Sequence, residues 1–387
     1  MDRNVKTILF HSIIAGLFAF AVRSVLAVLS PYLESLGISE TIISLVFGMF
    51  PLGMVLLSPV IGHISDRIGR NKIILAGLAL QSAALLLYIL DIHTAFLFIS
   101  RLLESGAAVS VGLITIAKIE DHMDQDTRGK YTGIGMSIKS VGKSGGSLAG
   151  GYIADYFGLI TPFYVGLSLT TGLLIVFSFV PRREDYSVSR GDFNLFRELG
   201  EFLSFVKLQG MAVLGFFMHA KNITIATFLP LFISKELGFS YSVVGNTLFL
   251  LGVLHLLQFA WGSLIDGKKK SNFVVGGVLT TAVALLIFSQ AQTSYILYLA
   301  ALVHSLGASL WNTSAWAFMS DIGEENDIEG EVVGSYMSLS KIGALPASIV
   351  NGFIVTYLGY SSLFGLYAGL VTLAGVVALA MFARSRA

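Results

Sequence analysis

The residues best suited to chemistry in this sequence are ionisable side chains that stand inside long apolar segments. They comprise one carboxylate among several cations and histidines: Glu104, Arg23, Arg101, Lys139, Lys143, His219, Lys221, His255, His304 and Lys341. A charge at the centre of a bilayer costs about 2.5–3.5 kcal/mol on insertion scales. Because that cost is high, we expect these residues to bind a substrate, carry a proton or pair with one another.

Glu104 is the predicted proton carrier, with Arg101 and His304 as the other members of a proton-coupling set. Glu104 follows Arg101 by three residues, so the two side chains share one helical face and can form an ion pair. His304 stands 200 residues after Glu104, at the matching place in the second half of the chain. A lone histidine on an apolar helix can also be a hydrogen-bonded packing residue, and this alternative stays open.

The excess of cations over carboxylates inside the apolar segments indicates an anionic substrate. Arg23 precedes Pro31 by eight residues and Lys221 precedes Pro230 by nine, which are near-equivalent places in the two halves. The predicted substrate-binding residues are Arg23, Lys139, Lys143, Lys221, Lys341, Trp311 and Asn312. The alternative for each base is a structural role, with its charge satisfied by backbone carbonyls or reaching the membrane surface. For Trp311 the alternative is aromatic packing.

The apolar segments that must position these groups follow from composition. Of 387 residues, 55% are hydrophobic and 13% are charged, whereas a soluble globular protein is about a quarter charged. So few charges cannot cover a water-soluble surface, and we expect lipid as the surrounding solvent. The net charge of +1 provides no bulk attraction to nucleic acid, and a sequence without cysteine excludes disulfides and thiolate metal sites.

Twelve segments are apolar enough for a transmembrane helix, which needs about 20 such residues. We predict spans at 7–30, 41–64, 72–91, 94–117, 130–154, 160–180, 209–234, 243–265, 272–291, 293–319, 332–356 and 360–383. The first is too long for a signal peptide and is followed by Pro31 instead of a small-residue cleavage site. Phenylalanine, leucine and charges alternate in the 181–208 loop, which predicts a short amphipathic helix on the membrane surface.

Lysine and arginine predict the orientation, because they concentrate on the cytoplasmic side of membrane proteins. If both termini are cytoplasmic, the inside segments carry most of the basic residues, whereas the outside loops hold only Lys235. We therefore expect a multi-pass protein of the cell (inner or plasma) membrane, with both termini and the 181–208 loop in the cytoplasm.

The two halves of the chain repeat a pattern. The glycine and aspartate of Gly62–Asp66 recur as Gly262 and Asp266, at an offset of 200 residues. A longer match, at an offset of 201, joins 129–158 to 330–359 and contains nine identities in register. Parallel repeats of this kind predict two related bundles with a binding site between them near the middle of the membrane.

The segment after span two reads Gly62-His-Ile-Ser-Asp66-Arg67-Ile-Gly69-Arg70-Asn71-Lys72. It resembles the loop signature of the major facilitator superfamily, with one departure at Asn71, where a base is usual, and the resemblance extends over the whole chain. In that family this loop latches the outward-facing state. The resemblance therefore implies a conformational latch formed by Gly62, Asp66, Arg67, Gly69, Arg70 and Asp266. Glycines here allow close helix approach and a tight turn, and the alternative is a merely solvated turn.

Span five carries a glycine signature at Gly142, Gly146, Gly150 and Gly151. It is similar to the exporter signature of the drug:proton antiporter (12-helix) branch of the same superfamily, except that Ser147 stands where a proline is usual. The resemblance implies export. The alternative is simple packing of helices through small residues.

We therefore predict an all-α integral membrane protein of 12 transmembrane helices, built as two pseudo-symmetric six-helix bundles. The predicted domains are 1–180 and 209–387, joined by a cytoplasmic linker at 181–208. The predicted function is proton-coupled secondary active transport by alternating access, with export of an organic anion or amphipathic small molecule. The alternatives are an anion importer or exchanger without proton coupling, and a non-transporting membrane receptor or scaffold.

The expected partners are a small-molecule substrate, protons and the lipid bilayer, and we expect a monomer that binds no nucleic acid. A membrane enzyme would show paired carboxylates or a histidine cluster at one depth, and the sequence contains neither. We therefore expect no enzymatic activity, no metal and no cofactor.

Overall fold

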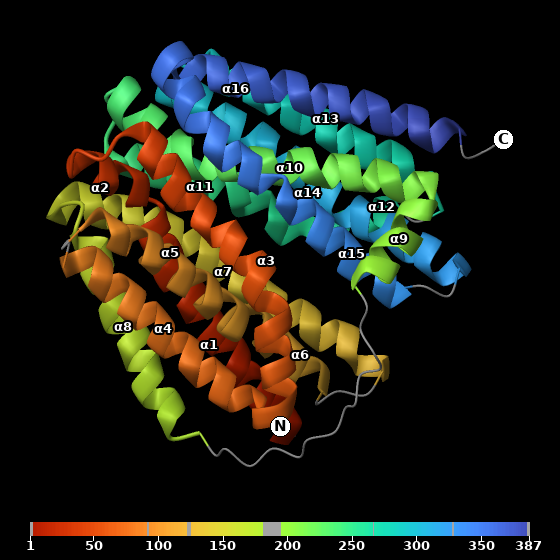
Figure 1. The fold of residues 1–387 in the computed structure, drawn as a ribbon, viewed down its shortest axis with the longest axis horizontal. Coiled ribbons are helices and arrows are strands. Elements are labelled where there is room, and N and C mark those ends of the chain that lie inside the picture. The colour runs from red at the N-terminus through yellow and green to blue at the C-terminus, as the bar shows by residue number, and fades with distance from the viewer. Residues whose placement is uncertain are drawn as a thin grey trace. The chain divides into compact units, whose positions relative to one another are not determined.

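The computed structural model describes residues 3–90, 93–121, 125–180, 195–265, 267–326 and 329–384. Within these ranges every regular element is a helix (Figure 1). The elements are α1 (Arg3–Leu26), α2 (Leu29–Ser35), α3 (Glu40–Ile68), α4 (Arg70–Leu90), α5 (Thr94–Ala107), η1 (Ala108–Leu113), α6 (Ile114–Asp121), α7 (Gln125–Phe157), α8 (Thr161–Ser178), α9 (Leu195–Ser204), α10 (Val206–Leu231), η2 (Phe232–Glu236), α11 (Tyr241–Val253), η3 (Leu254–Leu257), α12 (Gln258–Ile265), α13 (Lys270–Ser289), α14 (Ser294–Asn326), α15 (Glu329–Ile342) and α16 (Ala344–Arg384). Here η1 and η2 are π-helical and η3 is a 3-10 helix.

Among the described residues, nine helical stretches are long and apolar enough to cross a membrane. The last of them, Ser335–Arg384, covers two predicted spans, because α16 is interrupted at Gly359. Helix α7 and the α11–η3–α12 stretch occupy the remaining two predicted spans. The helices thus account for the twelve spans predicted from the sequence. Large apolar side chains such as Leu373 (59% exposed) face outward, as expected of a surface in contact with lipid.

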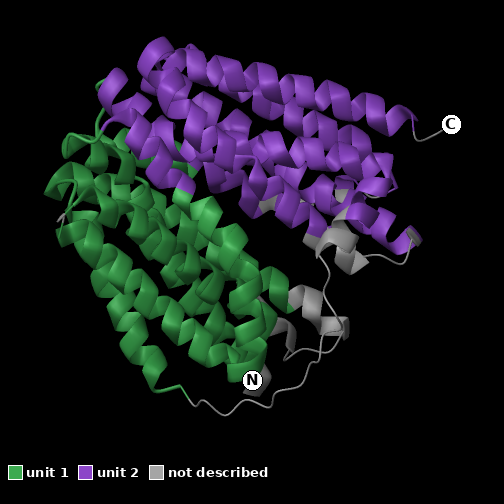
Figure 2. Cartoon of the chain, viewed as in Figure 1, with its two compact units in different colours: residues 1–38, 49–189, 238–249 green, residues 39–48, 190–237, 250–387 purple. Residues whose placement is uncertain are grey.

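The chain forms two compact units (Figure 2). Unit 1 consists of residues 1–38, 49–189 and 238–249, and unit 2 consists of residues 39–48, 190–237 and 250–387. In unit 1, α1 packs on α7 and α8, and α4 packs on α5 and α8. In unit 2, α10 packs on α15 and α16, and α13 packs on α14 and α16. The same helix pairings in the same order confirm the predicted pseudo-symmetry, while the domain boundaries at 180 and 209 stay predictions.

The predicted linker is described only from residue 195 onward, and the preceding 181–194 lie outside the described residues. Helix α9 forms within it, in agreement with the predicted amphipathic helix. Helix α9 contacts α10 and α15, and Phe202 is 1% exposed. At least this side chain of the linker helix is therefore held by unit 2.

Glycines with positive φ terminate helices at equivalent places in the two repeats. Gly158 (φ 92°) separates α7 from α8, and Gly359 (φ 80°) divides α16. Nothing lies within 4 Å of a Cβ built at either position, so each glycine is required by its backbone conformation and not by crowding.

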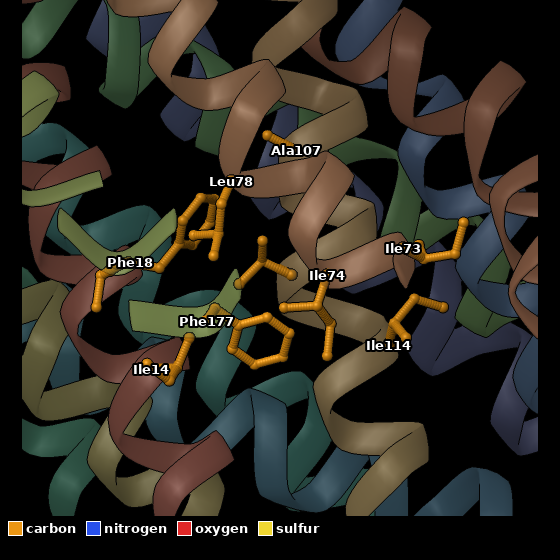
Figure 3. Close-up of a cluster of buried hydrophobic side chains, with 10 residues drawn as sticks. Ile14, Phe18, Ile73, Ile74, Leu78, Ala107, Ile114 and Phe177 are labelled. Carbon is orange, nitrogen blue, oxygen red and sulfur yellow. The ribbon is translucent and has the colours of Figure 1, made fainter. Parts of the chain in front are cut away.

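An apolar core holds unit 1 together (Figure 3). It joins Phe18 of α1, Ile74 and Leu78 of α4, and Phe177 of α8, and Ile74 and Leu78 are fully buried. In a membrane, lipid is as apolar as these side chains, so the core is stabilised by close van der Waals packing more than by exclusion of water.

Candidate functional site

The glycine signature of α7 forms a close contact with α1 in unit 1. A Cβ built on Gly142, Gly146 or Gly150 would collide with a backbone carbonyl oxygen of α1. The facing residues of α1, also four apart, are Gly16, Phe20 and Ser24. Gly151 packs in the same way on α11, against Tyr241 and Gly245. These contacts support the packing role of the signature, and its connection with export stays a proposal.

Three predicted substrate-binding cations of unit 1 stand on this α1–α7 frame. Lys139 donates a hydrogen bond from Nζ to the carbonyl oxygen of Gly112, 3.1 Å away in the π-helix η1. Lys143 is exposed and Arg23 is half-buried. The charges of Arg23 and Lys139 both act on Lys143. Within the described residues, neither Arg23 nor Lys143 is bonded to a carboxylate, so this group has a positive charge that the surrounding protein does not balance.

Arg101 and Glu104 form the ion pair predicted from their spacing. Arg101 NH1 lies 2.5 Å from Glu104 Oε2, and the two residues are 4% and 3% exposed. Tyr88 donates from its hydroxyl to Oε2 over 3.3 Å, and Gln81 donates from Nε2 to Oε1 over 3.4 Å. The guanidinium also lies over the ring of Phe50, 5.0 Å from its centroid. A proton that arrives at Glu104 must therefore compete with three hydrogen-bond donors.

In unit 2 the structure brings Lys221 and His304 together. Lys221 Nζ lies 2.8 Å from His304 Nε2, and the two residues are 0% and 6% exposed. The sequence singled out both residues but assigned them to different groups, one to substrate binding and the other to proton coupling. Nδ1 of His304 is buried and has no hydrogen-bond partner among the described residues.

The other predicted residues of unit 2 lie nearby in the chain but take different roles. Lys341 and Asn312 are half-buried. Trp311 is 7% exposed, and its backbone nitrogen would meet a Cβ at Gly277 of α13 at 2.5 Å. Its position therefore supports the close α13–α14 packing that was the alternative to substrate binding.

The predicted latch lies at the turn from α3 to α4. Gly69 has φ 106°, a conformation that favours glycine. Asp66 Oδ1 pairs with NH1 of Arg70, the first residue of α4, at 3.2 Å, while Arg67 is exposed. The close helix approach predicted for Gly62 is wrong for the described residues, since nothing lies within 4 Å of a Cβ built there. Asp266 lies outside the described residues.

Two polar contacts near this turn escaped sequence reasoning. Lys118 donates from Nζ to Oδ1 of Asn71 over 2.6 Å, so the residue that departs from the family signature accepts a base from α6. In unit 2, Lys270 Nζ lies 2.5 Å from Asp321 Oδ1. The available signal was weak: Lys270 matches Arg70 at the repeat offset, but its partner lies 51 residues away in sequence.

Membrane-spanning helices in two related units, each enclosing charged side chains, define a multi-pass membrane protein of the transporter class. A family model described as Major Facilitator Superfamily matches residues 12–218 and 211–387, so the chain belongs to this family.

Similar proteins extend over nearly the whole chain. The class C tetracycline resistance protein of Escherichia coli is 24% identical over 371 residues, which cover 92% of this chain and 90% of that protein. The crystal structure of the nucleoside transporter NupG matches with TM-score 0.82 at 15% identity, covering 97% of this chain and 98% of that one. The D-xylose-proton symporter matches with TM-score 0.75 at 14% identity, covering 96% of each chain. These structural matches support the major facilitator fold.

Proposed function

We propose that this transporter is a proton-coupled secondary active transporter that exports an organic anion, or an amphipathic molecule with an anionic group, by alternating access. The observation that carries the anion assignment is the group of Arg23, Lys139 and Lys143, in which neither Arg23 nor Lys143 is bonded to a carboxylate among the described residues. Unbalanced cations in a medium of low polarity favour a negatively charged ligand.

Export and proton coupling are supported by similarity. A tetracycline resistance protein is among the relatives, and a protein titled a D-xylose-proton symporter is among the structural matches. We extend to this chain the family's conformational latch, with Asp66 and Arg70 as its paired charges. Glu104, assisted by Arg101, and His304 are the candidate proton acceptors.

The anion assignment is tested with Arg23→Ala in proteoliposomes. Substrates would come from a thermal-shift screen of metabolite and drug libraries that includes tetracycline. Loss of a charge-assisted hydrogen bond costs about 1.5–3 kcal/mol, so the apparent KM should rise by about ten- to a hundredfold. Lys207→Ala is the control, because Lys207 lies near the beginning of α10 and outside the group. An unchanged KM in Arg23→Ala, or transport of purely cationic substrates, would contradict the anion assignment.

Proton coupling is tested by imposing a pH gradient across the same vesicles. The substrate should accumulate only with the gradient, whereas exchange across equilibrated membranes should continue without it. Glu104→Gln and His304→Gln should separate the two candidate acceptors, since the variant that lacks the coupling group loses accumulation but retains exchange. Transport that ignores the gradient in the unaltered protein would favour an anion exchanger.

A further inference from the structure

Lys221 and His304 are two basic side chains in direct contact inside unit 2. Their nitrogens lie 2.8 Å apart, and the side chains come from α10 and α14. Neither residue is bonded to a carboxylate within the described part of the chain. The pair is therefore unlike Arg101 and Glu104, whose opposite charges balance each other.

Hydrogen-bond chemistry limits the charge of this pair. In a contact between two nitrogens, one must donate and the other must accept. If Lys221 is an ammonium group, it donates to Nε2, and the imidazole must be neutral with its proton on Nδ1. If Lys221 is a neutral amine, its lone pair accepts from Nε2–H. A doubly charged pair has no acceptor and brings two like charges together in a buried place, which disfavours the second charge.

Other titratable groups around the pair are also bases. His255 of η3 acts electrostatically on His304. His219 lies two residues before Lys221 on α10, donates or accepts at Nδ1 next to the Gly215 carbonyl oxygen 3.1 Å away, and is acted on by Lys341 of α15 and by Lys221. Since a carbonyl oxygen only accepts, Nδ1 of His219 is the donor. These neighbours oppose a second positive charge on the pair.

We propose that Lys221 and His304 act as one proton-binding unit that carries a single positive charge when loaded and none when empty. The proton enters from bulk water onto the shared N–N contact, and the loaded pair keeps it between Lys221 Nζ and His304 Nε2. As the proton site of a coupled transporter, this unit rests on the function proposed above.

Histidine NMR of the full-length protein tests this proposal. The protein would be labelled with ¹³C and ¹⁵N in histidine, purified in detergent, and recorded from about pH 5 to 9, with the His304 signal assigned by its loss in His304→Gln. Lys221→Met should change the titration midpoint of His304 by about one pH unit or more, because the partner that competes for the proton is gone. Lys341→Met is the matched control and should alter His219 while leaving His304 within experimental error.

Two results would overturn the proposal: a His304 titration unchanged by Lys221→Met, or a His304 ring that is doubly protonated at neutral pH in the unaltered protein. If Lys221→Met does not fold, Lys221→Gln removes the same charge and serves the same comparison. The measurement needs no transport. A transporter indifferent to pH gradients would refute the proposed coupling and leave the pair intact, whereas an unmoved His304 would refute the pair alone.

Discussion

Gly146→Ala tests the contact between α1 and α7 that positions the cations of unit 1. The added Cβ would overlap the carbonyl oxygen of Phe20 and lie 2.8 Å from its Cα and 3.0 Å from its carbonyl carbon. Ordinary contacts begin at 3.4 Å, so the helices must separate by about 0.6 Å at Cα (3.4 − 2.8). All of these are backbone atoms, so a change of rotamer cannot relieve the overlap. Insertion of one methyl into a packed site typically costs about 1–3 kcal/mol.

Gly145→Ala is the matched control on the adjacent residue. Its Cβ would lie 3.8 Å from Phe20 Cδ2 and 3.9 Å from Cε2, so it fits without displacement. Both variants gain about 1 kcal/mol of helix propensity, and this gain cancels in the comparison. Thermal unfolding in one detergent, followed by tryptophan fluorescence, should place Gly146→Ala below Gly145→Ala by about 1–4 °C, from the usual unfolding entropy per residue. Equal midpoints, or a higher one for Gly146→Ala, would refute the reasoning.

Two further predictions concern the buried ion pair and the membrane orientation. Glu104→Gln alone leaves the buried charge of Arg101 unpaired and should cost about 3–5 kcal/mol, whereas Arg101→Met combined with Glu104→Gln should cost much less; additive losses in a double-mutant cycle of thermal stability would contradict this. In the cysteine-free background, a cysteine at Lys269 should react with an impermeant thiol reagent only after cells are permeabilised, and one at His93 should react in intact cells. The reverse pattern would invert the proposed topology.

The helices and their glycine contacts could be predicted because they depend on local requirements. A span is recognised from its own apolar composition, and positive φ at Gly158 and Gly359 is a property of single residues that the repeat marks twice. The Arg101–Glu104 pair was equally accessible, because its two members lie within one helical turn. Gly62 shows the limit of this reasoning, since a glycine in a family signature does not reveal whether another helix approaches it.

Contacts between distant residues could not be predicted in the same way. Lys221 and His304 are 83 residues apart, and Lys118 and Asn71 are 47 apart. Each of these residues has many possible partners within a helical bundle, and composition alone does not select among them. Packing of the helices makes that selection, so the sequence identified the important residues but not the pairs that they form.

The repeat preserves the helical frame while its enclosed charges differ. Glu104 and His304 occupy matching positions, yet the first accepts from Arg101 in a balanced ion pair and the second contacts Lys221, another base. A balanced pair retains its charges without any ligand, because each ion stabilises the other. A pair of bases has no such balance, and its positive charge must be removed by losing a proton or offset by binding an anion. We therefore infer that a change of charge during transport is more readily accommodated at Lys221 and His304 than at Glu104, whose carboxylate is already held by Arg101, Tyr88 and Gln81.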